Sequence, residues 1–439
     1  MKFGDNPVVK SVCSFCLSLL VATSAFAQTP PDTTDYFSDK SLRYEDHVYE
    51  KNIRTAQLFS ATFNLGDPLI KLGSGEQLRL SFDDLDGGYK AYYYTVVHCS
   101  ANWEPSNIML SEYLDGFPDQ SVTEYKYSRN TIQKYTHYFA IFPHENMKIL
   151  RSGNYLLKVY TDNDQEKLVF TRRFMVYEDL VSIQARAHQA TIIESRNFKQ
   201  EVDFTINTTG YDLPNPFGEL NVILRQNNRW DNAVTGLKPQ FVRDKELIYD
   251  YDEENVFKGG SEFRWCDTRS LRYQNTRMAK FTFENNENHA YMINDEKRTF
   301  KRYLSSEDLN GRYIIHMDDY DASYEGDYAW VHFFLAYDPP TTEGNLYVFG
   351  GLSNWQCQPE FKLTYNKERK GYEGKVFLKQ GYYDYEYVLM RDNEKAADDF
   401  FIEGMHWETT NEYQVYVYRR APGNLYDQLI GVKKVNSNQ

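Results

Sequence analysis

Apolar and polar residues alternate over most of the chain, and this alternation predicts short β-strands. Residues 78–82 (LRLSF) alternate strictly, and residues 91–97 (AYYYTVV) are aromatic and β-branched. Both features are typical of strands. The turn-forming residues 83–88 (DDLDGG) separate the two segments, so we predict a hairpin here. Residues 162–164 (DND) predict another hairpin turn between two later strands.

The same pattern recurs in three stretches and predicts three tandem domains. Short strand-like segments at regular spacing are typical of immunoglobulin-like sandwiches. Residues 338–344 (DPPTTEG) are rich in turn formers and predict a linker before the last domain. The predicted fold class is therefore all-β, with tandem immunoglobulin-like or early-set β-sandwich domains. The predicted sandwiches cover residues 53–178, 179–337 and 345–421.

The two ends of the chain differ from these domains. Residues 11–25 form an apolar run that is too short for a membrane helix. The small residues Ala25 and Ala27 follow as a cleavage site, so residues 1–27 are predicted to be a cleaved signal peptide. The polar residues 28–52 predict a flexible leader, and residues 422–439 a frayed tail.

Charge and composition exclude several classes of partner. A net charge of -14 and a pI near 5.2 argue against a protein that binds nucleic acid or anionic membranes. No stretch after the signal approaches the roughly 20 apolar residues of a membrane helix, so no direct membrane insertion is expected. The 37 tyrosines and 28 phenylalanines favour β-structure.

Cysteine usage predicts no disulfide framework. Cys99, Cys266 and Cys357 remain after the predicted cleavage, and at least one of three thiols must stay free within one chain. Small buried hydrophobic side chains are the favoured role for all three.

Catalytic and metal motifs give no positive signal. The chain has no H-E-x-x-H, G-x-S-x-G, Walker or Rossmann pattern, so we expect no catalytic residue, no cofactor and no enzymatic activity. A glycosidase pair of carboxylates stays open as an alternative, because the chain has many acidic residues.

Two acidic turns invite a calcium hypothesis, because carboxylate oxygens suit this hard cation. In the first, however, the loop spacing places Phe82 and Tyr93 at the terminal ligand positions. Solvated turns are therefore favoured, and no metal site is predicted. The acidic residues concerned are Asp83, Asp84 and Asp86 in the first turn and Asp318, Asp319 and Asp321 in the second.

The last predicted domain is similar to the early-set sandwich of glycogen- and starch-binding modules. Residues 381–387 (GYYDYEY) match the G-x-Y-x-Y-x-F strand of those modules, and Trp355 falls at the position of their first sugar-binding tryptophan. The loop tryptophan is missing, because residues 391–394 (RDNE) stand there. Trp355, Trp407 and Tyr387 are the candidate aromatics for a glucan or for an interface, and packing is favoured over sugar binding.

Long blocks of the chain resemble the plug-protein family of the bacterial type IX secretion system. These blocks are SGEQLRLSFDDLDGG, YYYTVVHCSANWEPS, TIQKYTHYFAIFPHENM and, near the end, IEGMHWETTNEYQVYVYRR. The resemblance implies a periplasmic, non-enzymatic protein that closes the periplasmic opening of the outer-membrane translocon barrel. That barrel is then the expected partner.

The rival hypothesis comes from another class. It is a carbohydrate-binding accessory protein or a polysaccharide-acting enzyme, suggested only by the last predicted domain. The plug hypothesis needs a wide contact surface, and abundant tyrosine supplies contact area at low entropic cost.

Overall fold

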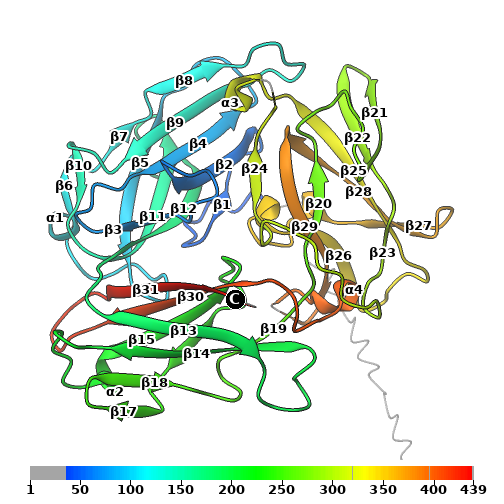
Figure 1. Ribbon diagram of the computed structural model, residues 1–439. Helices are drawn as coiled ribbons and strands as arrows, with labels where there is room; N and C mark the ends of the chain where they lie inside the picture. The colour runs from blue at the N-terminus through cyan, green and yellow to red at the C-terminus, as the bar shows by residue number, and fades with distance from the viewer. Residues whose placement is uncertain (1–35, 319, 395, 438–439) are drawn as a thin grey trace, which may run out of the picture.

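The computed structural model describes residues 36–318, 320–394 and 396–437, and β-strands dominate it (Figure 1). Helices among these residues are single turns of three or four residues. The strands form three lobes, each made of packed sheets. The predicted all-β class with tandem β-sandwich domains is confirmed. The predicted signal peptide lies outside the described residues.

The first sandwich packs the sheet β1-β12-β11-β5-β7, with β3 beside β12, against the sheet β2-β4-β9-β8. Inward-facing side chains of both sheets, such as Phe82 and Phe174, form its core. Its elements are β1 (His47–Val48), β2 (Ile53–Ser60), β3 (Leu69–Lys71), β4 (Leu78–Asp84), β5 (Tyr92–Cys99), α1 (Leu110–Tyr113), β6 (Leu114–Gly116), β7 (Gln120–Ser121), β8 (Glu124–Tyr127), β9 (Thr136–Phe142), β10 (Met147–Ile149), β11 (Gly153–Thr161) and β12 (Leu168–Tyr177).

The described part of the predicted leader is not flexible but belongs to this sandwich. β1 pairs with β12, and the hydroxyl of Thr171 donates to the carbonyl of Glu45 at 2.6 Å. His47 and Tyr49 are fully buried and contact each other edge to face. The polar composition of the segment therefore conceals a short buried strand.

The predicted hairpin of β4 and β5 is wrong, although both strands exist. β4 pairs with β2 and β9, whereas β5 pairs with β11 and β7 in the opposite sheet. The intervening residues therefore cross between the two layers. The hairpin at residues 162–164 is confirmed, since β11 and β12 pair there and Asp162 and Asn163 adopt positive φ.

The second sandwich is assembled from two distant parts of the chain. It packs the sheet β13-β14-β18-β17, with β19 beside β14, against the sheet β16-β15-β30-β31. In Figure 1 the red strands β30 and β31 lie beside the green strands of this lobe. Its elements are β13 (Ser182–Gln189), β14 (Lys199–Asn207), α2 (Pro216–Glu219), β15 (Leu220–Gln226), β16 (Val234–Leu237), β17 (Phe241–Arg243), β18 (Glu246–Tyr249), β19 (Val256–Lys258), β30 (Glu412–Arg419) and β31 (Gln428–Asn436).

The predicted boundaries at residues 337, 345 and 421 therefore differ from the structure. β30 leaves the predicted last domain to pair with β15, and the predicted frayed tail contains β31. Burial of apolar side chains explains why β30 pairs with β15. Val222 of β15 lies opposite Val417 of β30, and both belong to the core of the second sandwich.

The third sandwich is an insertion between β19 and β30. It packs the strands β20, β24 and β26 around β29 against the sheet β21-β22-β25-β28-β27, with β23 beside β25. The predicted linker, residues 338–344, joins β25 to β26 inside this sandwich, so its prolines mark a crossing between sheets. The elements are β20 (Arg264–Asp267), β21 (Met278–Glu284), β22 (Glu287–Met292), β23 (Asp295–Glu296), β24 (Tyr313–Ile315), α3 (Ala322–Glu325), β25 (Tyr328–Ala336), β26 (Gly344–Phe349), the 3-10 turns η2 (Gly351–Ser353) and η3 (Pro359–Phe361), β27 (Thr364–Asn366), β28 (Gly371–Lys379), β29 (Gly381–Arg391) and α4 (Phe400–Glu403).

The cysteines behave as small hydrophobic side chains. Cys99, Cys266 and Cys357 are all unpaired, which confirms the expectation of at least one free thiol. The first two are buried in apolar clusters, and burial raises the pKa of the Cys357 thiol to about 12. In the part of the chain that the structure describes, no helix has the length and apolar character needed to cross a membrane.

Candidate functional site

A cavity of about 450 Å³ lies where the three sandwiches meet. Each sandwich contributes charged and aromatic side chains to its wall. They include Asp67 and Arg172 from the first sandwich, Arg225 and Trp230 from the second, and Arg312 and Trp355 from the third. The junction brings together residues that are far apart in sequence, and it is the candidate site.

One ion-pair cluster at the junction joins all three sandwiches. Arg312, just before β24, contacts Asp67 of the first sandwich at 3.3 Å and Glu412 of β30 at 2.6 Å. The amide of Gln414 in β30 donates to Asp67 at 2.9 Å. Charge-assisted hydrogen bonds of this kind fix geometry as well as adding energy. The cluster therefore fixes the relative positions of the three domains.

Two arginines of the junction are held by aromatic rings and by uncharged oxygens. The guanidinium of Arg173 lies 4.4 Å from the ring centre of Trp103, and that of Arg225 lies 4.7 Å from Trp230. Arg225 also donates to the side-chain oxygen of Gln414 at 2.9 Å. Guanidinium groups suit such stacked positions because they are planar and weakly hydrated. Trp103 of the first sandwich and Trp230 of the second meet edge to face with their ring centres 5.1 Å apart, so the two stacks connect these sandwiches.

A buried ion pair joins the first and third sandwiches. Asp83 of β4 contacts the ammonium of Lys379 at 2.5 Å and accepts from the hydroxyl of Tyr328 at 2.7 Å. His137 Nδ1 lies 2.7 Å from the same carboxylate. Burial alone would raise the pKa of Asp83, but the charge of Lys379 and the hydrogen bond from His137 outweigh it and hold the pKa below its usual value. The predicted solvated turn is therefore wrong here: Asp83 and its neighbour Asp84 are fully buried.

Trp355 packs into the boundary between the second and third sandwiches. Arg229 of the second sandwich lies 5.3 Å from its ring centre and pairs with Asp399 of the third at 2.9 Å. Phe349 and Phe263 meet the ring edge to face. Trp355 thus lines the junction with one face covered by a guanidinium.

The other two candidate aromatics lie elsewhere. Tyr387 is fully buried in the core of the third sandwich, and its hydroxyl donates to Asp295 at 2.9 Å. Trp407 is half-buried in the connection that returns to β30, and its backbone N–H donates to the carbonyl of Asn197. A buried side chain such as Tyr387 offers no stacking surface to a ligand, so the three aromatics do not form one platform.

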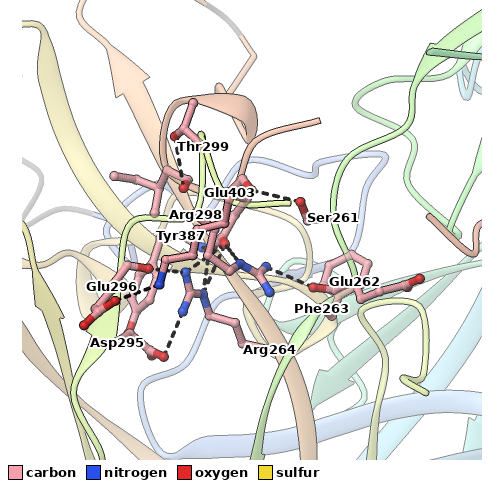
Figure 2. A network of polar contacts seen from close by, with 12 residues as sticks. Ser261, Glu262, Phe263, Arg264, Asp295, Glu296, Arg298, Thr299, Tyr387 and Glu403 are labelled. Carbon is pink, nitrogen blue, oxygen red and sulfur yellow. Dashed lines mark hydrogen bonds and ion pairs between the residues drawn. The ribbon is translucent and has the colours of Figure 1, made fainter. Parts of the chain in front are cut away.

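A second charged network lies inside the third sandwich (Figure 2). The carboxylate of Glu403 in α4 accepts from Arg264 at 2.9 Å and from Arg298 at 2.7 Å. Arg264 also contacts Asp295 at 2.8 Å. Burial alone would raise the pKa of Glu403, but the two guanidinium charges outweigh it and lower the pKa. The network attaches α4, the last element of the insertion, to β20 and β23.

Asp384 of β29 is a buried carboxyl whose surroundings favour its protonated form. It is fully buried, and it accepts hydrogen bonds from the backbone N–H groups of Leu309 and Gly311. Burial, together with the charge of Asp308, raises the pKa of Asp384 to about 8. Burial likewise raises the pKa of Asp308 to about 6.

This shift predicts a pH-dependent stability. Because folding raises the pKa of Asp384 from 3.8 to about 8, its protonated carboxyl contributes stability to the folded state that is fully present below pH 3.8. This stability is lost as the pH rises from 3.8 to about 8. Asp384→Asn cannot ionise, so its melting temperature is expected to fall less than that of the wild type across this interval. Thermal unfolding below and above this pH interval measures the effect, with Asp392→Asn, at an exposed position just after the end of β29, as control. Parallel pH profiles for Asp384→Asn and wild type would contradict the prediction.

Side chains of metal-binding type come together at one place among the described residues. His188 of β13 and Glu201 and Asp203 of β14 place their ligand atoms within 4.8 Å of one another. These residues form no contiguous metal-binding motif, so the sequence alone did not point to them. Their signal is an E-x-D alternation on one strand with a histidine on the preceding strand.

The contacts at the junction indicate a structural role, namely to hold the three sandwiches together. Its charged groups point at one another across domain boundaries, and an apolar cluster that includes Trp103 and Tyr416 continues the contact between the first and second sandwiches. Such contacts hold three domains in one arrangement.

Comparison with known proteins gives two matches. Residues 53–178 match the family model described as the type 9 secretion system plug protein 1st domain, the same range as the first predicted sandwich. The chain is also similar to a hypothetical protein from Parabacteroides merdae ATCC 43184, known from a crystal structure at 2.30 Å resolution. The two are 34% identical with a TM-score of 0.87, over 90% of this chain and 100% of that one. No curated protein matches the chain.

Proposed function

The chain belongs to the same family as the Parabacteroides merdae protein and carries a type 9 secretion system plug domain, and from this premise we propose that it is a periplasmic, non-enzymatic plug. In this role it closes the periplasmic opening of the outer-membrane translocon barrel. The observation that carries the proposal is the match of residues 53–178 to the first plug domain.

The junction supports this role. A plug must resist displacement as one body, and three loosely linked sandwiches would not. The cluster of Asp67, Arg312 and Glu412 ties the three domains together, and Asp83 and Lys379 add a buried bond across one boundary. The TM-score of 0.87 over nine tenths of the chain indicates that the relative shares this arrangement. Periplasmic location rests on the predicted signal peptide.

The sugar-binding alternative lacks a comparable observation. It depends on Trp355, and that ring is packed against Arg229, Phe349 and Phe263. Aromatic platforms for a ligand need a free face at the surface. We therefore favour a packing role for Trp355.

Deletion of the gene tests the proposal. Without the plug, the idle barrel is expected to leak, so permeability of the outer membrane to large solutes should rise. Expression of the full chain should restore the barrier, whereas the same chain without residues 1–27 should not, because it stays in the cytoplasm. A tagged full chain should also co-purify with the barrel from detergent-solubilised envelope. An unchanged barrier in the deletion strain, together with no barrel in the purified material, would contradict the plug role.

A further inference from the structure

Three side chains of metal-binding type lie on the outer face of one sheet in the second sandwich. β13 and β14 are antiparallel, and His188 lies directly opposite Glu201. Asp203 is two residues further along β14, so it shares the face of Glu201. The intervening Val202 points the other way, into the core. The strand register therefore brings one imidazole and two carboxylates together.

The tautomer of His188 leaves its second nitrogen facing the acids. Nδ1 lies 2.8 Å from the backbone carbonyl of Gln189 and must donate to it, because a carbonyl can only accept. Nε2 then lies 2.6 Å from Asp203 and 3.7 Å from Glu201. A histidine that ligates a metal is held in this way, with its other N–H donated to a carbonyl or carboxylate.

Each carboxylate is also held by a further partner. Glu201 accepts from the backbone N–H of Thr191 at 2.8 Å and from its hydroxyl at 3.1 Å. Asp203 accepts from the side-chain amide of Asn255 at 3.1 Å, and Asn255 is itself fully buried. Ligands that are oriented before binding lose less entropy when a metal arrives.

The charges of the cluster are not balanced by the protein. Glu201 is only 1% exposed, and its carboxylate lies beside that of Asp203. Burial raises the pKa of both carboxyls, with a further contribution from the charge of Asp203 at Glu201 and from that of Asp250 at Asp203. One imidazolium can compensate one negative charge, whereas a divalent cation compensates both. Arg186 lies opposite Asp203 in the ladder, but its side chain is exposed.

We propose that His188, Glu201 and Asp203 bind a divalent transition-metal ion through one nitrogen and two oxygens. Imidazole with carboxylates suits Zn²⁺ and its first-row neighbours, whereas Ca²⁺ and Mg²⁺ prefer oxygen ligands alone. Protein ligands bind Zn²⁺ at about 2.0–2.2 Å, and water completes the site. The bound ion would join β13 to β14 at the surface of the second sandwich. This inference does not depend on the plug role.

Titration of the full mature chain with Zn²⁺ tests the site. After treatment with a chelator, isothermal calorimetry is expected to show one equivalent of Zn²⁺ bound and a raised melting temperature. His188→Ala should abolish this binding, and Asp203→Asn should weaken it by about tenfold or more. His316→Ala, at an exposed histidine near Asp318 in the third sandwich, serves as the matched control and should bind Zn²⁺ like the wild type.

Co²⁺ provides a readout that does not depend on the variants. Its visible spectrum in the wild type should show nitrogen ligation in a low-coordinate site and should be lost on addition of Zn²⁺. If His188→Ala fails to fold, this spectrum decides the question. A spectrum of hydrated Co²⁺ in the wild type, or equal Zn²⁺ binding by wild type and folded His188→Ala, would overturn the proposal. Ca²⁺ that displaced Zn²⁺ at equal concentration would also overturn it, since the site would then be a carboxylate site.

Discussion

Glu403→Gln is expected to destabilise the third sandwich by about 3–5 kcal/mol, the usual cost of breaking a buried ion pair by removing one partner. Glu403 is 1% exposed and faces Arg264 and Arg298, both of which it accepts from at 3.0 Å or less. Glutamine keeps the shape but removes the charge, so the buried guanidinium of Arg264 loses one of its two carboxylate partners. Native-state hydrogen exchange at β20 and β29 measures the free energy of opening.

A matched control lies in the same network. Glu296 pairs with Lys301 at 2.7 Å, but both side chains are more than half exposed. Water screens such an exposed pair, so Glu296→Gln is expected to leave the free energy of opening nearly unchanged. The lowered pKa of Glu403 also makes the stability of the third sandwich depend on pH. The stability that Glu403 contributes is present above the ordinary pKa of glutamate and is lost as the pH falls through the lowered pKa. Equal effects of the two substitutions would contradict the prediction.

Strand positions were predictable from the sequence, but strand partners were not. Alternation reports which face of a strand is buried, and residues 78–82 accordingly lie in β4 and residues 92–97 in β5. It carries no information about which edges meet. The turn residues between β4 and β5 suit a hairpin and a crossing between layers equally well, and the crossing forms because β2 and β9 occupy both edges of β4.

Domain boundaries failed for a related reason. Residues 338–344 have the composition of a linker, and prolines and glycines mark a crossing between sheets as readily as a boundary between domains. The actual boundaries of the insertion lie near residues 259 and 411, where no turn-rich stretch of similar length occurs. Only the pairing of β30 with β15 reveals that the second sandwich is discontinuous.

The junction shows why a single sequence conceals such a site. Asp83 belongs to an acidic run that was noticed, but its partner Lys379 lies 296 positions further along the chain. Without that partner a carboxylate is expected in water, and the solvated turn follows. Asp67, Arg312 and Glu412 carry no local motif at all, because each comes from a different sandwich. The resemblance to the plug-protein family was visible in the sequence because it rests on long contiguous segments.

Lys379→Met is expected to loosen the boundary between the first and third sandwiches by about 3–5 kcal/mol. Lys379 is 1% exposed and Asp83 is fully buried, so the substitution leaves a carboxylate without its cation in an environment of low polarity. Burial lowers the pKa of His137, so the imidazole beside Asp83 is neutral and does not replace the lost ammonium. Hydrogen exchange at β4 and β28, the strands that carry Asp83 and Lys379, measures the effect.

Two further variants separate the ion pair from its surroundings. Lys126→Met removes a lysine that also reaches across this boundary, to Asp321 at 3.5 Å, but both side chains are nearly half exposed. It should cost less than about 1 kcal/mol. The double variant Lys379→Met with Asp83→Leu should recover much of the loss, because replacing both partners of a buried pair by apolar groups is often neutral. If the double variant were as unstable as Lys379→Met alone, the loss would reflect packing around the lysine stem, and the ion pair would not be what holds the first and third sandwiches together.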